Sequence, residues 1–530
     1  MMRYFRRYPL LLAALFLLLA VANAAPEDVK PGAKKPKLVL LIVVDQFRYD
    51  YLLRFRQDYH GGIARLLNNG AVFADARYLQ FPTVTAVGHS TIMSGASPSV
   101  SGIVNNEWFD RETDESVTSV SDKATVLLGG TPAAKGSSPR RLLVSTVGDE
   151  LKMAGRAGKV IGISIKDRSA ILPVGHMADA AYWFDNDSNH FVTSDYYMKK
   201  LPAWVGKIND DRPISKYLGT DWMPVNAKPA DKPFCSMKAG ADVRFCGTIE
   251  RTPFGNELLE EFAEKAIEQE ELGSHTGTDL LSLSLSANDY VGHDLGPDAP
   301  EVRDISIRTD QLLAKLFDFV NGRVGQENIL IVFTADHGVA PAPNVNNARK
   351  MPGGWMNASD YASKIGAKLV EKFGAGEWFR FDTYGFLYLN YATIAKNNAD
   401  RAEVRRFAAE AARNLPHIAR VATRDDLLHG SDGADAVGRA MQLGFYGPRS
   451  ADLVLLPEPY YMFSSAPGTT HATPYSYDNH VPVIFYGTGI SAGIHYGRVA
   501  VNDIAPTLAA ILGVETPSGS SGRILPEIMK

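Results

Sequence analysis

The feature that most constrains the fold of this chain is an uninterrupted aliphatic run over residues 38–44 that ends at Asp45. A continuous apolar run of strand length is typical of a strand that is buried on both faces of a parallel sheet. In such sheets ligands bind outside the carboxyl ends of the strands, where Asp45 would lie. The run therefore predicts an α/β fold with a ligand site near Asp45.

Further strands and helices alternate along the rest of the chain. Strand-like apolar runs occur at 160–165, 280–285, 329–333, 453–456 and 483–486, and helical spacing occurs at 61–69, 141–158, 256–270, 302–320 and 504–512. With 530 residues, of which 45% are apolar, the chain can bury a core large enough for one such domain. The pattern favours a doubly wound, mostly parallel central sheet flanked by helices, rather than separate domains in series.

The first 24 residues are typical of a secretory signal peptide. Three arginines precede residue 8, an uncharged apolar run covers 10–21, and Ala22-Asn23-Ala24 forms a cleavage site. The run is shorter than the ~18 residues that a membrane span needs, so we expect no stable membrane insertion after cleavage. An uncleaved anchor is the alternative. The sequence thus predicts export to the periplasm or beyond, with residues 25–530 as the mature catalytic domain.

The alternation of strands and helices is lost in two stretches, about 173–250 and about 340–450, which we interpret as insertions. The second contains a short strand at 385–389 and a charged helix at 401–413. The first is expected to cap the site. It contains Cys235 and Cys246, which are close in sequence in an exported chain and therefore predict one disulfide.

The overall charge argues against a nucleic-acid partner. A net charge of −4 and a pI near 6.3 leave no basic electrostatic footprint, so no nucleic-acid binding is expected. The expected partner is a small molecule, and the expected assembly is a monomer or a weak oligomer.

Three aspartates and three histidines follow the predicted buried strands. They are Asp45, Asp289, His293, Asp336, His337 and His471. Such nitrogen and oxygen ligands suit zinc or another divalent first-row metal, and six of them are enough for two ions. Taken singly, an aspartate after a strand is as often a helix cap, and a lone histidine is more often a structural residue. Their recurrence at strand ends favours a metal site.

Thr85 gives a two-metal site a chemical role. It lies in the turn Phe81-Pro-Thr-Val-Thr85-Ala-Val-Gly88-His89, and coordination to a dication would lower the pKa of its hydroxyl and make it a nucleophile. Alternatively, Thr85 caps a helix that begins at Ala86, which is compatible with catalysis because a helix N-terminus attracts anions. Chemistry alone leaves Thr83 open as a second candidate. His89 is expected to hold the turn.

Lys166 and Arg168 are candidate ligands for an anion. Residues two apart in a strand-like segment point to one face, so both cations could reach a dianionic phosphoryl group. The amide of Asn106 could donate to the same oxygens. A solvated loop with salt bridges is the alternative for the two cations.

Taken together, these motifs resemble the alkaline phosphatase superfamily, and with Lys166-Asp-Arg168 they are similar to its phosphate-irrepressible (PafA-like) branch. The matching blocks are Leu41-Ile-Val-Val-Asp45, Pro82-Thr-Val-Thr85 with Asn106, Asp289-Tyr-Val-Gly-His293, Thr334-Ala-Asp336-His337-Gly338 and Gly468-Thr-Thr-His471. Five blocks in the same order make the resemblance specific. It extends from about Lys37 to the end of the chain.

The resemblance implies two zinc ions and a role for each residue. One zinc would be held by Asp289, His293 and His471, and the other by Asp45, Asp336 and His337 together with Thr85. Thr85 would attack phosphorus to give a phosphothreonine, and Asn106, Lys166 and Arg168 would bind the non-bridging oxygens. The family pattern selects Thr85 over Thr83, and His471 over His480, nine residues further on. The implied activity is phosphate monoester hydrolysis.

Other activities remain as alternatives. A nucleotide pyrophosphatase or phosphodiesterase would share the metals, Thr85 and Asn106, but the paired cations Lys166 and Arg168 favour a monoester, which carries an extra negative charge. A sulfatase is disfavoured because the Cys-x-Pro-x-Arg motif is absent from the sequence. A non-catalytic phosphate- or metal-binding protein is the alternative from a different class.

Overall fold

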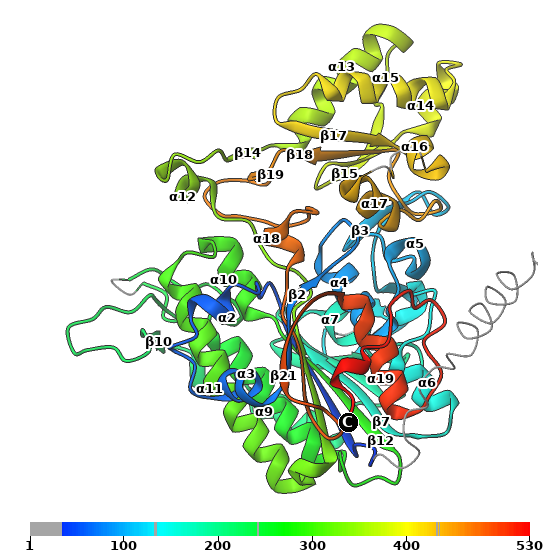
Figure 1. Ribbon diagram of the computed structural model, residues 1–530. Coiled ribbons are helices and arrows are strands. Elements are labelled where there is room, and N and C mark those ends of the chain that lie inside the picture. Colours follow the sequence, from blue (N-terminus) through cyan, green and yellow to red (C-terminus); the bar gives the residue numbers. More distant parts are fainter. Residues whose placement is uncertain (1–33, 132–134, 241–242, 431–432, 434) are drawn as a thin grey trace, which may run out of the picture. The chain divides into compact units, whose positions relative to one another are not determined.

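The computed structural model describes residues 34–131, 135–240, 243–430, 433 and 435–530. A central sheet lies between helices (Figure 1). Residues 35–530 form one compact unit. The predicted signal peptide lies outside the described residues.

Eleven strands of the described chain form this sheet. In spatial order they are β21 (Gly493–Ala500), β2 (Ala71–Arg77), β20 (Val483–Gly487), β13 (Ile329–Thr334), β1 (Leu38–Val44), β12 (Thr278–Leu285), β7 (Ala157–Ser164), β8 (Ala180–Asp185), β9 (His190–Ser194), β5 (Ser121–Leu128) and β6 (Lys135–Ser137). The five strands from β13 to β8 are parallel, and antiparallel strands flank them. The predicted mostly parallel sheet is thus confirmed at its centre.

β1 is a central strand of this sheet, and every one of its residues is buried. Val43 lies level with Ser284 on β12 and with Thr334 on β13, and Ser284 lies level with Ser164 on β7. The next residues of all four strands therefore leave the sheet at one edge. This register brings the candidate ligands together.

Helices cover both faces of the sheet, as a doubly wound fold requires (Figure 1). In one layer, helix α11 (Pro300–Val324) contacts both α3 (Gly62–Asn69) and α9 (Pro253–Gln269). The other layer includes α4 (Thr85–Ser94), α6 (Val147–Met153), α7 (Asp167–Ile171) and α19 (Ile504–Leu512). The helix predicted over 141–158 is shorter in the structure because a capping box between Thr146 and Asp149 starts it at Val147.

Three of the four strands of a smaller antiparallel sheet lie within the second predicted insertion. Its order is β15 (Phe379–Thr383), β16 (Phe386–Leu389), β18 (Leu453–Pro457) and β17 (Ile418–Thr423), and it packs with α13 (Ala358–Phe373) and α15 (Arg401–Arg413) around a separate apolar cluster. The strand at 453–456, expected to resume the main alternation, belongs to this sheet. Its aliphatic run fits either sheet, since burial alone does not identify the pairing partner.

The first predicted insertion differs from the expectation near its start. β8 and β9 lie in it and extend the central sheet, so the sheet reaches further than the helix–strand alternation indicated. Irregular structure follows from Tyr196, with α8 (Ala203–Asp210) and the short pair β10 (Asp221–Trp222) and β11 (Cys235–Ser236).

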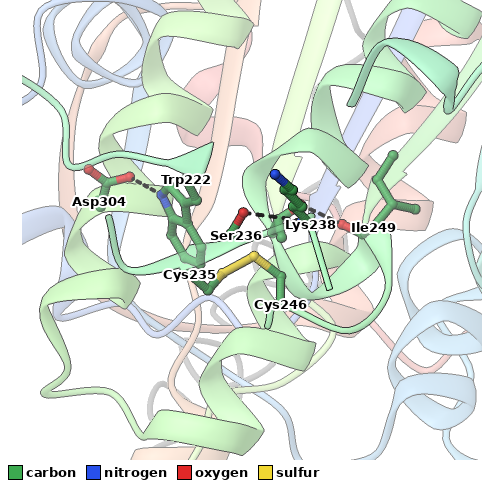
Figure 2. Close-up of a disulfide and its surroundings, with 8 residues drawn as sticks. Trp222, Cys235, Ser236, Lys238, Cys246, Ile249 and Asp304 are labelled. Atoms are coloured by element: carbon green, nitrogen blue, oxygen red, sulfur yellow. Dashed lines mark hydrogen bonds between the residues drawn. A yellow bond between two sulfur atoms is a disulfide. The ribbon is translucent and has the colours of Figure 1, made fainter. Parts of the chain in front are cut away.

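The predicted disulfide is present. Cys235 and Cys246 are bonded, with Cα atoms 5.1 Å apart, and Figure 2 shows the bond beside Trp222. The indole nitrogen of Trp222 donates to Asp304 of α11 at 2.7 Å, and Trp222 pairs with Cys235 across the two short strands. The disulfide therefore closes a loop that is anchored to the helical layer.

Among the described helices, none has the length and the apolar character needed to span a bilayer.

Candidate active site

All six predicted ligand residues lie at the carboxyl edge of the parallel strands, or on the loop that covers it. Asp45 follows β1, Asp289 and His293 lie on α10 (Ala287–Leu295) after β12, and Asp336 and His337 follow β13. His471 comes from the loop after β19 (Tyr461–Phe463). Sequence-distant groups are thus brought to one place by the strand register.

The first group consists of Asp289, His293 and His471. Oδ1 of Asp289 lies 3.2 Å from Nε2 of His293 and 3.8 Å from Nε2 of His471. One oxygen and two nitrogens therefore converge closely enough to bind a single ion.

The second group consists of Asp45, Asp336 and His337. Nε2 of His337 lies 3.5 Å from Oδ1 of Asp45 and 3.4 Å from Oδ2 of Asp336. Asp289 also lies within ligand distance of Asp45 and His337, so the two groups adjoin. The rings of His337 and His471 stack with centroids 3.6 Å apart, one from each group.

The charge in this cluster is unbalanced. Lys166 donates to Oδ2 of Asp45 and to Oδ2 of Asp289, each at 2.6 Å, whereas Oδ2 of the third buried carboxylate, Asp336, lies 3.3 Å from Nδ1 of His89. Oδ1 of Asp45 and Oδ2 of Asp336 are buried without a hydrogen-bond partner. Buried acceptors of this kind are costly unless a cation binds them, so the donor set fits divalent metal ions.

All three histidines are oriented for coordination through Nε2. Nδ1 of His293 contacts the carbonyl of Thr469 at 2.8 Å, and Nδ1 of His471 contacts that of Thr83 at 2.7 Å. Nδ1 of His337 contacts the carbonyl of Gly338 at 3.0 Å. Because a carbonyl accepts, Nδ1 carries the proton, and the lone pair of Nε2 faces the carboxylates.

The electrostatics of the metal-free site differ from residue to residue. Burial opposes protonation of His293, but the charge of Asp289 holds the pKa of this imidazole above its usual value. Burial lowers the pKa of His337 and of His471, so both imidazoles are neutral. Burial opposes ionisation of Asp289, but the charges of His293 and Lys166 hold the pKa of this carboxyl well below its usual value. Burial, followed by the neighbouring Asp289 and Asp336, raises the pKa of Asp45.

Thr85 is the first residue of α4 and points into this cluster. Its Oγ1 lies 3.4 Å from Nε2 of His337, and the N-cap residue of the helix is Val84, so Thr85 is not the cap. The hydroxyl of Thr83 instead donates to the carbonyl of Thr473 at 2.9 Å. The geometry therefore separates the two threonines that chemistry alone left open.

Close packing holds the turn around Thr85. A Cβ at Gly88 would lie 2.2 Å from the carbonyl oxygen of Asp336, so only glycine allows α4 to approach the β13 loop this closely. His89 contacts the carbonyl of Thr85 at 2.9 Å and Ser284 Oγ at 2.8 Å, in agreement with the structural role expected of it.

Asn106 and Arg168 lie at the edge of the same site. Oδ1 of Asn106 accepts from the backbone of Ala86 at 2.8 Å, so its amide nitrogen remains to meet an anion. Nε of Arg168 is buried without a partner. The prediction that Lys166 and Arg168 lie on one face of a strand-like segment was wrong. Strand β7 ends at Ser164, Lys166 is the N-cap of α7, and Arg168 lies in the first turn of that helix.

His480 lies away from the ligand cluster. Its Nε2 contacts the carbonyl of Ala74 at 3.0 Å, and its ring stacks on Tyr49 at 4.4 Å between centroids. His471, in contrast, is 4% exposed and faces Asp289.

Two residues at the site were missed by the sequence reasoning. Gln46 donates to Asp289 through its side chain and to Asp336 through its backbone. Tyr290 places its ring 5.1 Å from the ammonium of Lys166. The only signal for either was its position next to a predicted ligand.

The chain is similar to known proteins over most of its length. A family model described as type I phosphodiesterase / nucleotide pyrophosphatase matches residues 39–481. Alkaline phosphatase PafA of Elizabethkingia meningoseptica is 34% identical over 520 residues, covering 93% of this chain and 95% of that protein. Alkaline phosphatase PhoV of Synechococcus elongatus is 34% identical over 553 residues, covering 98% of each.

Solved structures agree on the fold. The crystal structure of wild-type alkaline phosphatase PafA matches with a TM-score of 0.88 at 33% identity, covering 94% of this chain and 100% of that chain. Murine ectonucleotide pyrophosphatase / phosphodiesterase 5 matches with a TM-score of 0.52 at 13% identity, covering 91% and 96%, and so shares the fold alone.

Proposed function

We propose, since the chain belongs to the type I phosphodiesterase / nucleotide pyrophosphatase family and is an alkaline phosphatase within it, that it hydrolyses phosphate monoesters through a phosphothreonine at Thr85 and two zinc ions. The observation that carries this proposal is that two groups of metal-type ligands meet beside Thr85, with Asp336 next to His337 and two buried carboxylate oxygens lacking a partner.

Thr85 is the nucleophile in this proposal. Its Oγ1 forms a bond to phosphorus while the bond from phosphorus to the leaving oxygen breaks, and water then cleaves the phosphothreonine to release inorganic phosphate. Bound dications supply the charge that lowers the pKa of the hydroxyl and stabilises the leaving oxygen. His337, 3.4 Å from Oγ1, holds the hydroxyl at the second ligand group.

Three further residues bind the non-bridging oxygens of the phosphoryl group. Lys166 contacts one carboxylate from each ligand group, so a phosphoryl group between the groups would lie next to its ammonium. The unpartnered Nε of Arg168 and the amide nitrogen of Asn106 add two more donors. Donors fixed before the reaction stabilise the charge that develops in the transition state.

Zinc and export complete the proposal. Three imidazole nitrogens and three carboxylates favour zinc over magnesium or calcium, which prefer oxygen ligands. The disulfide between Cys235 and Cys246 supports location of the protein in an oxidising compartment such as the periplasm. In this proposal the signal peptide is cleaved after residue 24 during export. We propose a monomer or weak oligomer that acts on small phosphate monoesters.

A phosphodiesterase is the second candidate, because the matching family model carries that description. The paired cations Lys166 and Arg168 favour the monoester, whose phosphoryl group carries one more negative charge. Rates on an aryl phosphate monoester and on the matching diester distinguish the two candidates, and a preference for the diester would reverse the assignment.

The decisive experiment compares Thr85→Ala with the wild-type protein and with Thr83→Ala. Hydrolysis of an aryl phosphate is expected to fall at least about 10³-fold in Thr85→Ala and to remain within about tenfold in Thr83→Ala. Metal analysis of both variants should give two zinc per chain. An active Thr85→Ala protein would exclude the phosphothreonine route.

A further inference from the structure

Gln46 lies directly after Asp45 and contacts both ligand groups. Its side-chain nitrogen donates to Oδ1 of Asp289 at 2.6 Å, and its backbone nitrogen donates to Oδ1 of Asp336 at 3.1 Å. Gln46 is 2% exposed, so water does not compete for these contacts. One residue thus holds one carboxylate of each group.

The backbone of Gln46 is in a conformation that glutamine rarely adopts. Its φ angle is +61°, in the left-handed region, which is strained for a residue other than glycine. This conformation turns the backbone N–H towards Asp336 two residues after the end of β1. A strained residue persists where surrounding contacts hold it, and here those contacts are the two ligand carboxylates.

The side chain of Gln46 fits a slot on α10. A Cβ at Gly292 would lie 1.8 Å from Oε1 of Gln46, so the absence of a side chain at this position makes room for the amide. Gly292 is three residues after Asp289 and therefore lies on the same face of the helix. The slot fixes the amide with its nitrogen towards Asp289.

From this geometry we propose that Gln46 is a positioning residue for the two-metal site, with its two hydrogen bonds divided between the two ligand groups. The side chain orients Asp289, and the backbone orients Asp336 and leaves Oδ2 of Asp336 directed at His337. Hydrogen bonds to ligating carboxylates typically change metal affinity about 10–100-fold. The inference rests on the proposed function, because it requires that these carboxylates bind metal.

The division between side chain and backbone predicts a selective defect. Gln46→Met keeps the backbone N–H and loses the side-chain donor, so the group with Asp289 should bind zinc about 10–100-fold more weakly while the group with Asp336 is unchanged. Gln46→Gly should give the same selective loss, although glycine relieves the backbone strain. Gly292→Ala should reproduce it with Gln46 intact, because the added methyl displaces the amide.

In the experiment, demetallated protein is titrated with zinc in competition with a chromophoric chelator. Each variant should bind one zinc ion as tightly as wild type and the other more weakly. A double variant, Gln46→Gly with Gly292→Ala, should be no worse than Gln46→Gly alone, since the methyl then meets no amide. Gln80→Met is the matched control: Gln80 is 1% exposed and donates to Thr91 at 2.9 Å. It should retain both equivalents.

Two results would overturn separate claims. If the wild-type protein binds two zinc ions and the Gln46 variants bind both with unchanged or equally weakened affinity, the positioning role is wrong and the proposed function stands. If the wild-type protein binds no zinc, the proposed two-metal function itself fails.

Discussion

Asp452 and the aspartates of the candidate metal site are all buried, but their charge is balanced in different ways. Oδ2 of Asp452 accepts from Arg111 and from the backbone of Leu389, each at 2.9 Å. Its Oδ1 accepts from Tyr391 at 2.6 Å and lies 3.7 Å from Arg405. Every oxygen of this carboxylate has a donor, so the cluster is complete.

The active-site carboxylates have the opposite pattern. Asp45 and Asp289 share Lys166, and Asp336 lies beside His89, while one oxygen of Asp45 and one of Asp336 are buried without a hydrogen bond. The comparison shows that burial of aspartates does not by itself indicate function. What distinguishes the functional cluster is an excess of acceptors over donors, because that excess is what a dication can satisfy.

The largest expected effect comes from removing one charge of the acceptor-rich cluster. Asp336→Asn should lower kcat/KM on an aryl phosphate at least about 10³-fold, because a metal ligand is lost. In the metal-free state Asp45→Asn should unfold at a higher temperature than wild type, because burial, followed by the charges of Asp289 and Asp336, raises the pKa of Asp45. Steady-state kinetics and thermal unfolding after chelation measure these two changes, and metal-free destabilisation would contradict the excess-acceptor explanation.

A smaller effect on stability, without loss of turnover, is expected in the donor-satisfied cluster. Asp452→Asn should reduce the free energy of unfolding by about 3 kcal/mol, because the guanidinium of Arg111 loses its counter-charge, whereas Arg405 keeps Asp425. The kcat/KM of the folded protein should stay within about twofold of wild type. Denaturant unfolding provides the measurement.

The control for Asp452 is the pair of Arg380 with Asp114, whose carboxylate side chain is 71% exposed. Asp114→Asn should cost less than about 1 kcal/mol, as is usual for surface ion pairs. Equal losses in the two variants would remove the distinction between a complete buried cluster and an ordinary surface pair.

The smallest expected effect tests a third way of burying a carboxylate. Asp478 is fully buried, its Oδ2 accepts from Thr473, and its Oδ1 has no partner. Burial raises its pKa to about 8, so at neutral pH its charge is removed by a proton instead of a cation. Because the folded-state pKa lies above the unfolded value, this residue's contribution to stability falls as pH rises towards 8.

Asp478→Asn removes this titration. The difference in free energy of unfolding between wild type and the variant should decrease by about 2 kcal/mol from pH 6 to pH 8. The expected slope is ~1.4 kcal/mol per pH unit over most of that interval, because the folded protein binds one proton more than the unfolded chain. Urea unfolding at both pH values measures it. A difference that is constant with pH would show that Asp478 is ionised in the folded protein.

Much of the fold and of the ligand set could be predicted because both depend on local sequence patterns, namely apolar runs, helical spacing and short motifs. The run at 38–44 forms β1 within its predicted bounds, and helices at 401–413 and 504–512 match α15 and α19. The family resemblance inferred from five short blocks was confirmed by whole-chain identity to PafA and PhoV. The pairing of residues 453–457 with the smaller sheet was missed, since apolar character does not specify a partner strand.

The sequence by itself determined which groups are available: the strands that end in aspartates, the histidines that follow them, and the threonine turn. The tertiary structure decided which of them meet. Strand register places Asp45 and Asp336 at one edge, His471 enters the cluster while His480 packs on Tyr49, and Gln46 joins the two groups. These outcomes depend on contacts between residues hundreds of positions apart, and no local pattern of side chains encodes such distances.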